Sequence, residues 1–396
     1  MSDMGRTITD ATKDRVRGSF TPVALRDGVL ITIHRFSYGG ADRVAVLLAN
    51  GFAAAGLRTG IVLLREGGEG QHALLKLLDP TVAVACAGAS LRSRHLELVR
   101  GLRFIGHQID LAEPAIVLAS SSNMGLVTGL SRRATRASAP RYVMKLTNPV
   151  IRPTHRSLVR RSYRKWLYDF IFARFDQVLL LSEMERVSLN RLYPWYSQRF
   201  SVVPNPYVSA EMFDAPSRQV GGVRRILALA RLMPQKRLDR LICAFALMQT
   251  RNARLVIVGD GPERARLQHL AASMGVADRL DLPGFVEDVV PWLMRADVLA
   301  LTSDYEGLPA AVLEALAAGV PVVTTDCFEE AHALLDQADQ CAVVAVDDID
   351  ALARTLDGVL ANPERPTTLS MIARPYEMHA AVAAHVAAVT AGDTSA

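Results

Sequence analysis

Arg231 and Lys236 stand five positions apart in a proline-containing segment that follows an apolar run. Two fixed cations at this spacing can straddle a diphosphate. They can also hold the negative charge that develops on a phosphate leaving group, a task that a divalent metal performs elsewhere. The alternative is a pair of loop cations that only decorate the surface. We therefore take both residues as candidate catalytic groups.

Two glutamates, Glu306 and Glu314, flank a predicted helix start. Gly307 and Pro309 stand just before an apolar-periodic stretch, and this order marks a helix N-terminus. Backbone N–H groups of such a turn can face a phosphate or sugar oxygen. Each carboxylate can accept hydrogen bonds from two hydroxyls, as the vicinal diols of a hexose or ribose offer. The alternative roles are helix-dipole complementation for Glu306 and a salt bridge for Glu314.

A third cluster, Gly39-Gly40, lies between an apolar run and a predicted helix. Adjacent glycines let the backbone approach a ligand closely, and a helix N-terminus attracts phosphate. A tight strand-to-helix turn is the alternative. The segment is not a G-x-G-x-x-G fingerprint, which argues against a dinucleotide-dependent oxidoreductase.

The elements that must position these clusters alternate along the chain. Short β-branched runs follow longer amphipathic stretches, which is typical of parallel sheets flanked by helices. The predicted strands are Val29–Ile33, Gly60–Leu64, Val82–Cys86, Ala115–Ala119, Arg141–Thr147, Asp176–Leu181, Arg225–Ala230, Arg254–Val258, Arg279–Leu282, Val298–Thr302, Val320–Thr325 and Ala342–Val346. The predicted helices are Asp42–Ala55, Thr154–Phe172, Leu238–Met248, Pro262–Met274, Leu308–Ala318, Ile349–Leu360 and Tyr376–Thr390. All three clusters follow strands, where parallel sheets bind ligands.

The segment Val203-Pro204-Asn205-Pro206 interrupts this alternation and is followed by a loose stretch to Gly222, as in an interdomain linker. We therefore expect an α/β chain of two Rossmann-like, doubly wound domains that face each other across a cleft. The expected parts are a polar tail at 1–27, domains at 28–206 and 207–375, and a C-terminal helix and tail at 376–396. That helix could cross back to the first domain.

The composition agrees with two globular domains, since 396 residues with 50% hydrophobic content can bury large cores. The cysteines form no C-x-x-C pair, so we expect reduced thiols rather than a zinc site or a disulfide framework. The N-terminal residues contain no apolar leader, so we expect a cytosolic protein. The stretch 114–131 is too polar in its middle to span a bilayer. The four cysteines are Cys86, Cys243, Cys327 and Cys341.

Charge is distributed unevenly along the chain. Residues 1–205 carry 29 Lys and Arg against 15 Asp and Glu, and no acidic residue lies between Glu113 and Asp169. A solvated basic face is one interpretation. The other is a patch for anionic lipid head groups or a phosphate-bearing acceptor, where each charge contributes about 1 kcal/mol. A nucleic acid could also bind so basic a segment, but the sequence contains no nucleic-acid recognition motif.

The basic residues of the stretch are Arg132, Arg133, Arg136, Arg141, Lys145, Arg152, Arg156, Arg160, Arg161, Arg164 and Lys165. The predicted membrane patch comprises Arg152, Arg156, Arg160, Arg161, Arg164 and Lys165.

Taken together, the two cations, the glycine turn Gly259-Asp260-Gly261-Pro262 and the E-x7-E element resemble the retaining glycosyltransferases of family 4, the glycosyl transferases group 1. The resemblance covers nearly the whole chain and is most specific from 227 to 323. It implies the GT-B fold, with an N-terminal acceptor domain and a C-terminal donor domain.

The same resemblance implies transfer of a hexose-type sugar, with retention, from a nucleotide diphosphate sugar to a glycan or lipid-linked acceptor. Synthesis of a cell-envelope polysaccharide or glycolipid is the implied setting. The nucleotide sugar serves as co-substrate, and no metal is required. We expect a cytoplasmic location, peripheral on the inner face of the cytoplasmic membrane.

The resemblance also implies roles for individual residues. Arg231 and Lys236 would bind the donor diphosphate. Glu306 would touch the transferred sugar, helped by the amides of Gly307 and Leu308. Glu314 would bind the ribose.

Further donor contacts are implied at loop positions. Phe285 and Val286 lie in the segment that matches the base-binding turn of the family. The remaining donor-binding positions are Gly39, Gly40, Gly259 and Gly261. Gly39 and Gly40 match the N-terminal glycine loop that faces the phosphates.

The chain departs from the family pattern at three places. Arg237 and Ala230 stand where the family usually has glycine. Asn148 stands where many members carry a histidine against the donor sugar; it can hydrogen-bond a hydroxyl but cannot shuttle a proton. His34 could substitute for that histidine, so Asn148 and His34 are the expected acceptor or sugar contacts. A sugar-nucleotide epimerase of the same fold and a non-catalytic nucleotide-sugar-binding partner protein remain alternatives.

Overall fold

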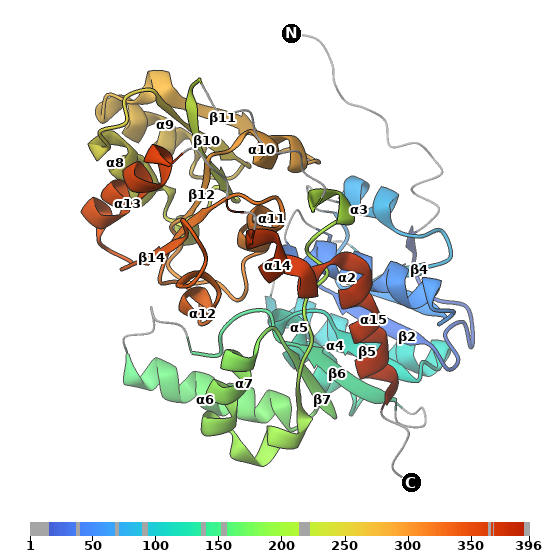
Figure 1. Ribbon diagram of the computed structural model, residues 1–396. Helices are drawn as coiled ribbons and strands as arrows, with labels where there is room; N and C mark the ends of the chain where they lie inside the picture. The colour runs from blue at the N-terminus through green and yellow to red at the C-terminus, as the bar shows by residue number, and fades with distance from the viewer. Residues whose placement is uncertain are drawn as a thin grey trace. The chain divides into compact units, whose positions relative to one another are not determined.

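The computed structural model describes residues 16–36, 40–67, 71–88, 94–135, 140–151, 157–213, 222–362, 366 and 368–391. The chain divides into two compact units. The first comprises Met1–Val150, Ser162–Pro206 and His379–Ala396, and the second comprises Ile151–Arg161 and Tyr207–Met378. Each unit contains one parallel sheet with helices on its faces (Figure 1).

The sheet of the first unit has the strand order β1-β4-β3-β2-β5-β6-β7-β8, and every pairing is parallel. Its central strands are runs of Val, Ile, Leu and Ala whose side chains are buried on both faces, as a sheet covered by helices on each side requires. The strands are β1 (Val16–Arg17), β2 (Val29–Ile33), β3 (Thr59–Leu63), β4 (Ala83–Cys86), β5 (Ile116–Ala119), β6 (Arg141–Lys145), β7 (Gln177–Leu180) and β8 (Phe200–Val202).

The helices that accompany this sheet lie between its strands in the sequence, except for α15, which lies near the C-terminus. They are α2 (Gly40–Ala54), α3 (Gln71–Leu77), α4 (Arg94–Ala112), α5 (Ser122–Ser131), α6 (Leu158–Phe172), α7 (Glu183–Leu192), the 3₁₀ helix η1 (Pro194–Arg199) and α15 (Met378–Thr390). No helix among the described residues combines the length and apolarity that crossing a bilayer requires. The stretch 114–131 instead forms β5 and α5.

The sheet of the second unit has the order β11-β10-β9-β12-β13-β14, again with only parallel pairs. Its strands are β9 (Arg224–Leu229), β10 (Ala253–Val258), β11 (Leu280–Gly284), β12 (Val298–Leu301), β13 (Val322–Thr325) and β14 (Ala342–Val344). Its helices are η2 (Ala210–Met212), η3 (Pro234–Lys236), α8 (Leu238–Leu247), α9 (Arg264–Ser273), η4 (Ala277–Arg279), α10 (Val290–Arg295), α11 (Ala310–Ala317), α12 (Ala331–Leu335), α13 (Ile349–Ala361), α14 (Leu369–Ala373) and η5 (Arg374–Tyr376).

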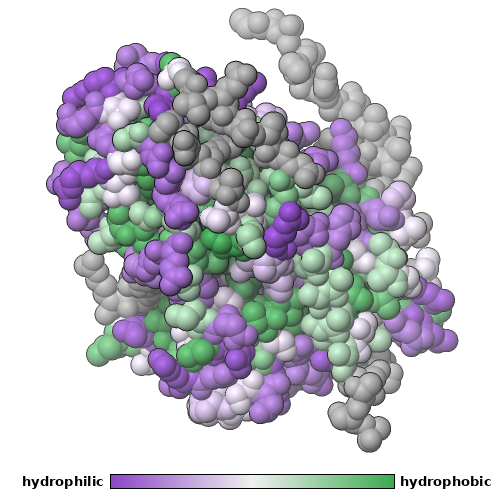
Figure 2. Space-filling view, viewed as in Figure 1, coloured by the Kyte–Doolittle hydropathy of each residue, from purple (hydrophilic) through white to green (hydrophobic). Residues whose placement is uncertain are grey.

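One core of the second unit forms where α8 and α13 pack against the sheet. Leu241, Phe245 and Leu356 are completely buried there, together with Ile226 and Leu255 of β9 and β10. Hydrophilic side chains dominate the outer surface over α8, α9 and α13 (Figure 2). The apolar faces of α8 and α13 therefore turn to the sheet, as in any amphipathic helix of a doubly wound fold.

The predicted fold class is confirmed: both halves are parallel, doubly wound α/β units. The predicted strands lie within two residues of the observed ones. The helices α4, α5 and α7 were not predicted, nor were the shorter helices α3, α10, α12 and α14 or the short strands β1 and β8. The helices α4 and α7 are more polar overall than α2 and α8, and α5 has little apolar periodicity, so neither signal identifies them.

The C-terminal helix α15 packs in the first unit. Its residues Ala381, His385 and Val389 are buried, and a Cβ at Gly51 of α2 would lie 2.1 Å from the Val382 side chain. Only a glycine lets α2 and α15 approach this closely. The contacts tie the end of the chain to the first sheet.

Lys145 and Arg141, counted in the acid-free basic stretch, bind α15 rather than forming a surface patch. Lys145 is completely buried, with Nζ 2.7 Å from Nε2 of His385. Nδ1 of His385 donates to the Ala381 carbonyl, so Nε2 is left to accept from the lysine. Arg141 donates to the Val389 carbonyl near the end of α15. Tertiary burial overrides the surface preference of these cations.

Burial makes the stability of the first unit depend on Lys145. Desolvation lowers the pKa of Lys145 to about 7, only partly opposed by the charge of Glu185. Between this pKa and its ordinary value, the unfolded chain holds a proton that the folded chain has lost. The folded state is therefore favoured as pH rises through this window.

We predict that wild type gains stability relative to Lys145→Met between pH 7 and 10, by up to roughly 1.4 kcal/mol per pH unit. Burial lowers the pKa of folded His385, and its titration in the unfolded chain is common to both proteins, so it contributes little to the difference above pH 7. Urea unfolding followed by circular dichroism at pH 7, 8, 9 and 10 measures the difference. A difference that stays constant with pH would contradict the prediction.

Candidate functional site

The candidate site of the second unit is built at the carboxyl ends of β9, β10 and β12, which are neighbours in the sheet. The loop after β9 contains η3, and the loop after β12 leads into α11. Parallel strands place such loops at one edge, where open α/β sheets bind their ligands. Residues far apart in the sequence therefore meet there.

Lys236 and Glu306 form an ion pair across these two loops. The lysine Nζ lies 2.6 Å from Oε1 of Glu306, and the two side chains are only 20% and 12% exposed. The hydroxyl of Ser303 donates to the same carboxylate oxygen at 2.6 Å. The Glu306 amide donates to the Cys327 carbonyl. Lys236 and Glu306, two of the predicted catalytic residues, are therefore in contact.

The Cys327 thiol lies close to this carboxylate. Burial, and after it the charge of Glu306, raises the pKa of the Cys327 thiol to about 12.

Backbone and side-chain hydrogen bonds hold the two loops in register. Gln235 Nε2 donates to the Tyr305 carbonyl at 2.7 Å, and the Asp304 amide donates to the Gln235 carbonyl at 2.9 Å. The hydroxyl of Thr302 donates to the carbonyls of Lys236 and Arg237. These bonds fix the backbone of Lys236 relative to the loop that carries Glu306, while the lysine side chain is held by the ion pair.

Arg237, which replaces the usual glycine, keeps the backbone conformation that glycine favours. Its φ of 47° is left-handed, which is rare for a residue with a side chain. Its guanidinium forms ion pairs with Asp239 and Asp304 at 3.1 and 3.3 Å. Burial alone would raise the pKa of Asp239, but the hydrogen bonds and charge of Arg237 lower it. These contacts offset the strain of the backbone.

Arg240 adds a second cation to Asp304. It is 5% exposed, and its guanidinium lies 2.7 Å from both Asp304 and Asp347. Sequence reasoning missed Ser303, Asp304 and Arg240. The sequence offered one hint of this arrangement. Arg237 and Arg240 stand three residues apart at the start of α8, so both guanidinium groups could reach one carboxylate, which the structure shows to be Asp304.

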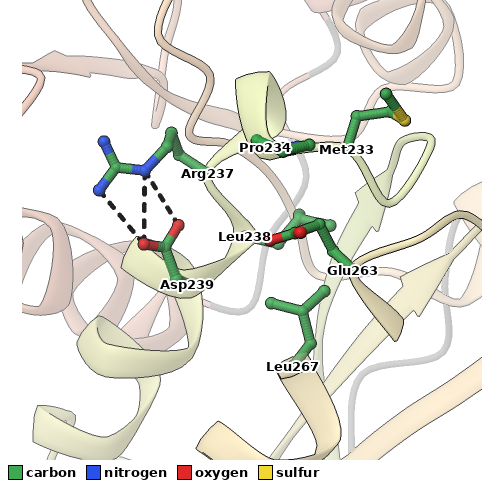
Figure 3. A pocket seen from close by; sticks show the side chains of 7 residues that line it. All are labelled: Met233, Pro234, Arg237, Leu238, Asp239, Glu263 and Leu267. Carbon is green, nitrogen blue, oxygen red and sulfur yellow. Dashed lines mark hydrogen bonds and ion pairs between the residues drawn. The ribbon is translucent and has the colours of Figure 1, made fainter. Parts of the chain in front are cut away.

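A shallow pocket lies beside the Arg237–Asp239 ion pair, and Figure 3 shows the two side chains facing each other at its edge. Its lining residues are Met233, Pro234, Arg237, Leu238, Asp239, Glu263 and Leu267. It lies between the η3–α8 segment and the first turns of α9 and includes neither Lys236 nor Glu306. No group of metal-ligating side chains occurs within the part of the chain that the structure describes.

The glycine turn after β10 packs directly against the loop after β9. A Cβ at Gly259 would lie 2.0 Å from the Ala230 carbonyl oxygen, and one at Gly261 would lie 2.5 Å from that of Leu232. Both have positive φ, of 138° and 157°. The Leu232 amide donates to the Asp260 carbonyl across this contact. These glycines thus allow the two loop backbones to pack closely beside Lys236. Their contact with the nucleotide sugar stays a prediction.

The other predicted donor residues occupy the same edge of the sheet. Arg231 is exposed, and none of the described residues forms an ion pair with it. Gly307 is half-buried and Leu308 is buried, just before α11, which begins at Ala310 rather than at the predicted Leu308. Glu314 is buried within that helix.

Phe285 and Val286 follow β11 at the end of the sheet. Phe285 is 44% exposed, which is unusual for a large aromatic side chain, and Val286 is half-buried. Their predicted contact with the nucleotide base stays a prediction.

In the first unit, the polar candidates follow strands that pair with β5. His34 follows β2 and is exposed; partial desolvation, and after it the charge of Arg35, lowers its pKa. Asn148 follows β6 and lies 3.4 Å from the hydroxyl of Thr147, whose amide donates to Ser122. Gly40 is the first residue of α2, while Gly39 lies outside the described residues.

The predicted basic patch falls partly on α6. Arg160, Arg161 and Lys165 are exposed, whereas Arg164 is half-buried and donates to the Val150 carbonyl. Arg152 and Arg156 lie outside the described residues.

The same helix exposes apolar side chains that charge counting missed. Leu158 and Val159 are more than three-quarters exposed, and Tyr163 and Trp166 are 58% and 60% exposed. Trp166 stacks on Phe170 with ring centroids 5.9 Å apart. The opposite face, with Tyr168, Ile171 and Phe172, is buried. The helix therefore carries a second apolar stripe, formed by Val159, Tyr163, Trp166 and Phe170, at the i, i+3, i+4 spacing that the sequence already contained.

Comparisons with known proteins place both halves in related families. Residues 38–209 match the model described as Glycosyltransferase Family 4, and residues 211–375 match that of the Glycosyl transferases group 1. A lipopolysaccharide core biosynthesis glycosyltransferase, LpsE of Rhizobium meliloti, is 30% identical over 37% of this chain and 42% of its own length. A GDP-mannose-dependent alpha-(1-6)-phosphatidylinositol monomannoside mannosyltransferase of Mycolicibacterium smegmatis is 32% identical over 44% of this chain and 48% of its own length. The chain thus spans less than half the length of these curated relatives.

Solved structures share the whole fold at low identity. The Anabaena protein Alr3699/HepE in complex with UDP and glucose superposes with a TM-score of 0.73 at 16% identity, over 92% of this chain and all of that one. WaaG, a glycosyltransferase involved in lipopolysaccharide biosynthesis, gives 0.71 at 18% identity, over 92% of this chain and all of that one. At these identities, the likeness shows the fold alone.

The glycine turn generates a stability prediction. Gly259→Ala introduces a Cβ that collides with a carbonyl oxygen, so the β9 and β10 loops must separate. Gly284→Ala is the matched control, because its φ of 93° is also positive but no described atom lies within 4 Å of the added Cβ. We expect Gly284→Ala to cost roughly 1–2 kcal/mol and Gly259→Ala about 2 kcal/mol more. Chemical denaturation of both variants measures this, and equal losses would contradict it.

Proposed function

The chain belongs to glycosyltransferase family 4, and on this basis we propose that it transfers a hexose-type sugar from a nucleoside diphosphate sugar to an acceptor hydroxyl with retention. The observation that carries the proposal is the Lys236–Glu306 ion pair at the carboxyl ends of β9 and β12. It joins a cation for phosphate and a carboxylate for sugar hydroxyls, both largely buried, on the loops that follow β9 and β12.

Charge and geometry support binding of a donor in the second unit. The ammonium of Lys236 has three hydrogen-bond donors and is partly exposed, and Arg231 of the same loop is exposed. Both cations can therefore contact phosphate oxygens. Glu314, on α11, is the proposed ribose contact, and Phe285 and Val286 are the proposed base contacts.

The proposed reaction breaks the bond between the anomeric carbon and the diphosphate and forms a bond from that carbon to the acceptor oxygen on the same face. The acceptor proton passes to the departing phosphate, whose charge Arg231 and Lys236 hold. This route needs no histidine at the position of Asn148. We propose that the acceptor binds to the first unit near His34 and Asn148, which follow β2 and β6.

The names of related proteins support the substrate class. The HepE structures contain UDP, or UDP-glucose, while the mycobacterial relatives use GDP-mannose. LpsE and WaaG act in lipopolysaccharide synthesis. A glycan or lipid-linked acceptor of the cell envelope is therefore the proposed acceptor class.

Nucleotide binding tests the donor site. We expect one of UDP, GDP or ADP, or its glucose or mannose derivative, to raise the melting temperature of the wild type. At a ligand concentration 100 times the dissociation constant, the added stability is roughly 2.7 kcal/mol. Lys236→Ala should reduce the shift, and Arg251→Ala, an exposed cation elsewhere in the unit, should not. A shift that Lys236→Ala leaves intact would refute the assignment of Lys236.

We further propose that the protein acts at the surface of the cytoplasmic membrane, docked through α6. The stripe of Val159, Tyr163 and Trp166 faces solvent opposite the buried side of the helix, with exposed Arg160, Arg161 and Lys165 on the same turns. Aromatic rings beside cations suit the interface of an anionic bilayer, because rings enter the head-group region and cations meet lipid phosphates. Such docking would bring the enzyme to a lipid-linked acceptor.

Vesicle binding tests this surface. We expect the wild type to co-sediment with vesicles of phosphatidylglycerol and phosphatidylcholine at low salt, and less with phosphatidylcholine alone. Tyr163→Ser/Trp166→Ser removes the rings that would enter the head-group region, and Arg160→Glu/Arg161→Glu reverses two charges worth about 1 kcal/mol each. Each double variant should weaken binding at least tenfold. The matched control is Arg251→Glu/Arg295→Glu, which removes two exposed cations of the second unit. Equal binding by all four proteins would refute docking through α6.

A further inference from the structure

Glu306 uses only one of its two carboxylate oxygens. Lys236 Nζ and Ser303 Oγ both donate to Oε1, each at 2.6 Å. No residue in the described part of the chain donates to Oε2. The carboxylate is therefore held from one side, and Oε2 is the oxygen that remains for a ligand.

The two donors differ in how firmly they are held. Lys236 reaches Glu306 through a flexible four-carbon stem and is 20% exposed. Ser303 is completely buried, and its carbonyl accepts a hydrogen bond from the Thr325 hydroxyl of β13 at 3.0 Å. The neighbouring Thr302 ties the same loop to the carbonyls of Lys236 and Arg237. Ser303 is thus the rigid donor and Lys236 the movable one.

A diphosphate would draw Lys236 away from Glu306, because it carries more negative charge than a single carboxylate. Glu306 would then keep Ser303 as its remaining protein donor on Oε1. Without the serine, the buried carboxylate of Glu306 would rotate or turn to another partner at the moment when it must contact the sugar.

We infer that Ser303 is a positioning residue of the donor site: its hydroxyl holds Glu306 so that Oε2 stays available to a hydroxyl of the donor sugar while Lys236 serves the diphosphate. The inference rests on the proposed function. It assigns Ser303 to recognition of the sugar and not of the nucleotide.

The test compares the affinity for a nucleotide with the affinity for its sugar derivative. Isothermal titration with UDP and UDP-glucose, or with GDP and GDP-mannose, gives the factor by which the sugar improves binding. We expect Ser303→Ala to reduce that factor about tenfold while the affinity for the bare nucleotide stays within twofold. Ser303→Thr retains a hydroxyl and should restore the factor.

Thr324→Val is the matched control. Thr324 is equally buried on β13, and its hydroxyl donates to the Thr325 carbonyl, but it does not contact Glu306. We expect its sugar factor to equal that of the wild type. Thermal unfolding of all variants checks that each is folded.

Three results would overturn the inference. The first is an unchanged sugar factor in Ser303→Ala, and the second is an equal loss for nucleotide and sugar nucleotide, which indicates a purely structural role. The third is a failure of Ser303→Thr to restore the factor. If the wild type binds neither nucleotide, the proposed donor site itself is refuted. The titration of the wild type therefore separates this outcome from a failure of the inference about Ser303.

Discussion

A largely buried ion pair between Lys236 and Glu306 joins the two loops on which the candidate site depends. Removing a lysine and a glutamate from water is costly, and such a pair is tolerated only when its remaining hydrogen-bonding groups find partners. Here Ser303 supplies a second donor to the carboxylate, and the loop backbones are bonded to each other through Gln235 and Thr302. The local structure around β9, β12 and β13 is arranged to hold these two charges together.

The same edge of the sheet concentrates further charge in a small space. Asp304 accepts from both Arg237 and Arg240, and Arg240 also pairs with Asp347. A left-handed arginine follows the lysine at a place where glycine would be unstrained. Its ion pairs compensate for the conformation, so the departure from the family pattern preserves the loop.

The N-terminal half of the chain uses its excess of positive charge differently from what counting residues suggests. Lys145 and Arg141 form hydrogen bonds with α15, and Arg164 donates to the Val150 carbonyl. The remaining cations of α6 stand beside exposed aromatic residues. Whether a basic residue serves the core or the surface depends on which face of its element it occupies, and therefore on how that element packs.

By itself, the sequence determined the parallel α/β class, most strand positions and the loops that carry Arg231, Lys236 and Glu306, because alternating apolar runs, prolines and glycines act locally. It did not determine that Lys236 contacts Glu306 seventy residues away, that Ser303 and Arg240 support the pair, or that Lys145 is buried against His385. Those facts follow from strand order and helix packing. Strand order decides which carboxyl ends are neighbours, and burial decides which polar groups must pair, and neither is encoded in the spacing of residues along the chain.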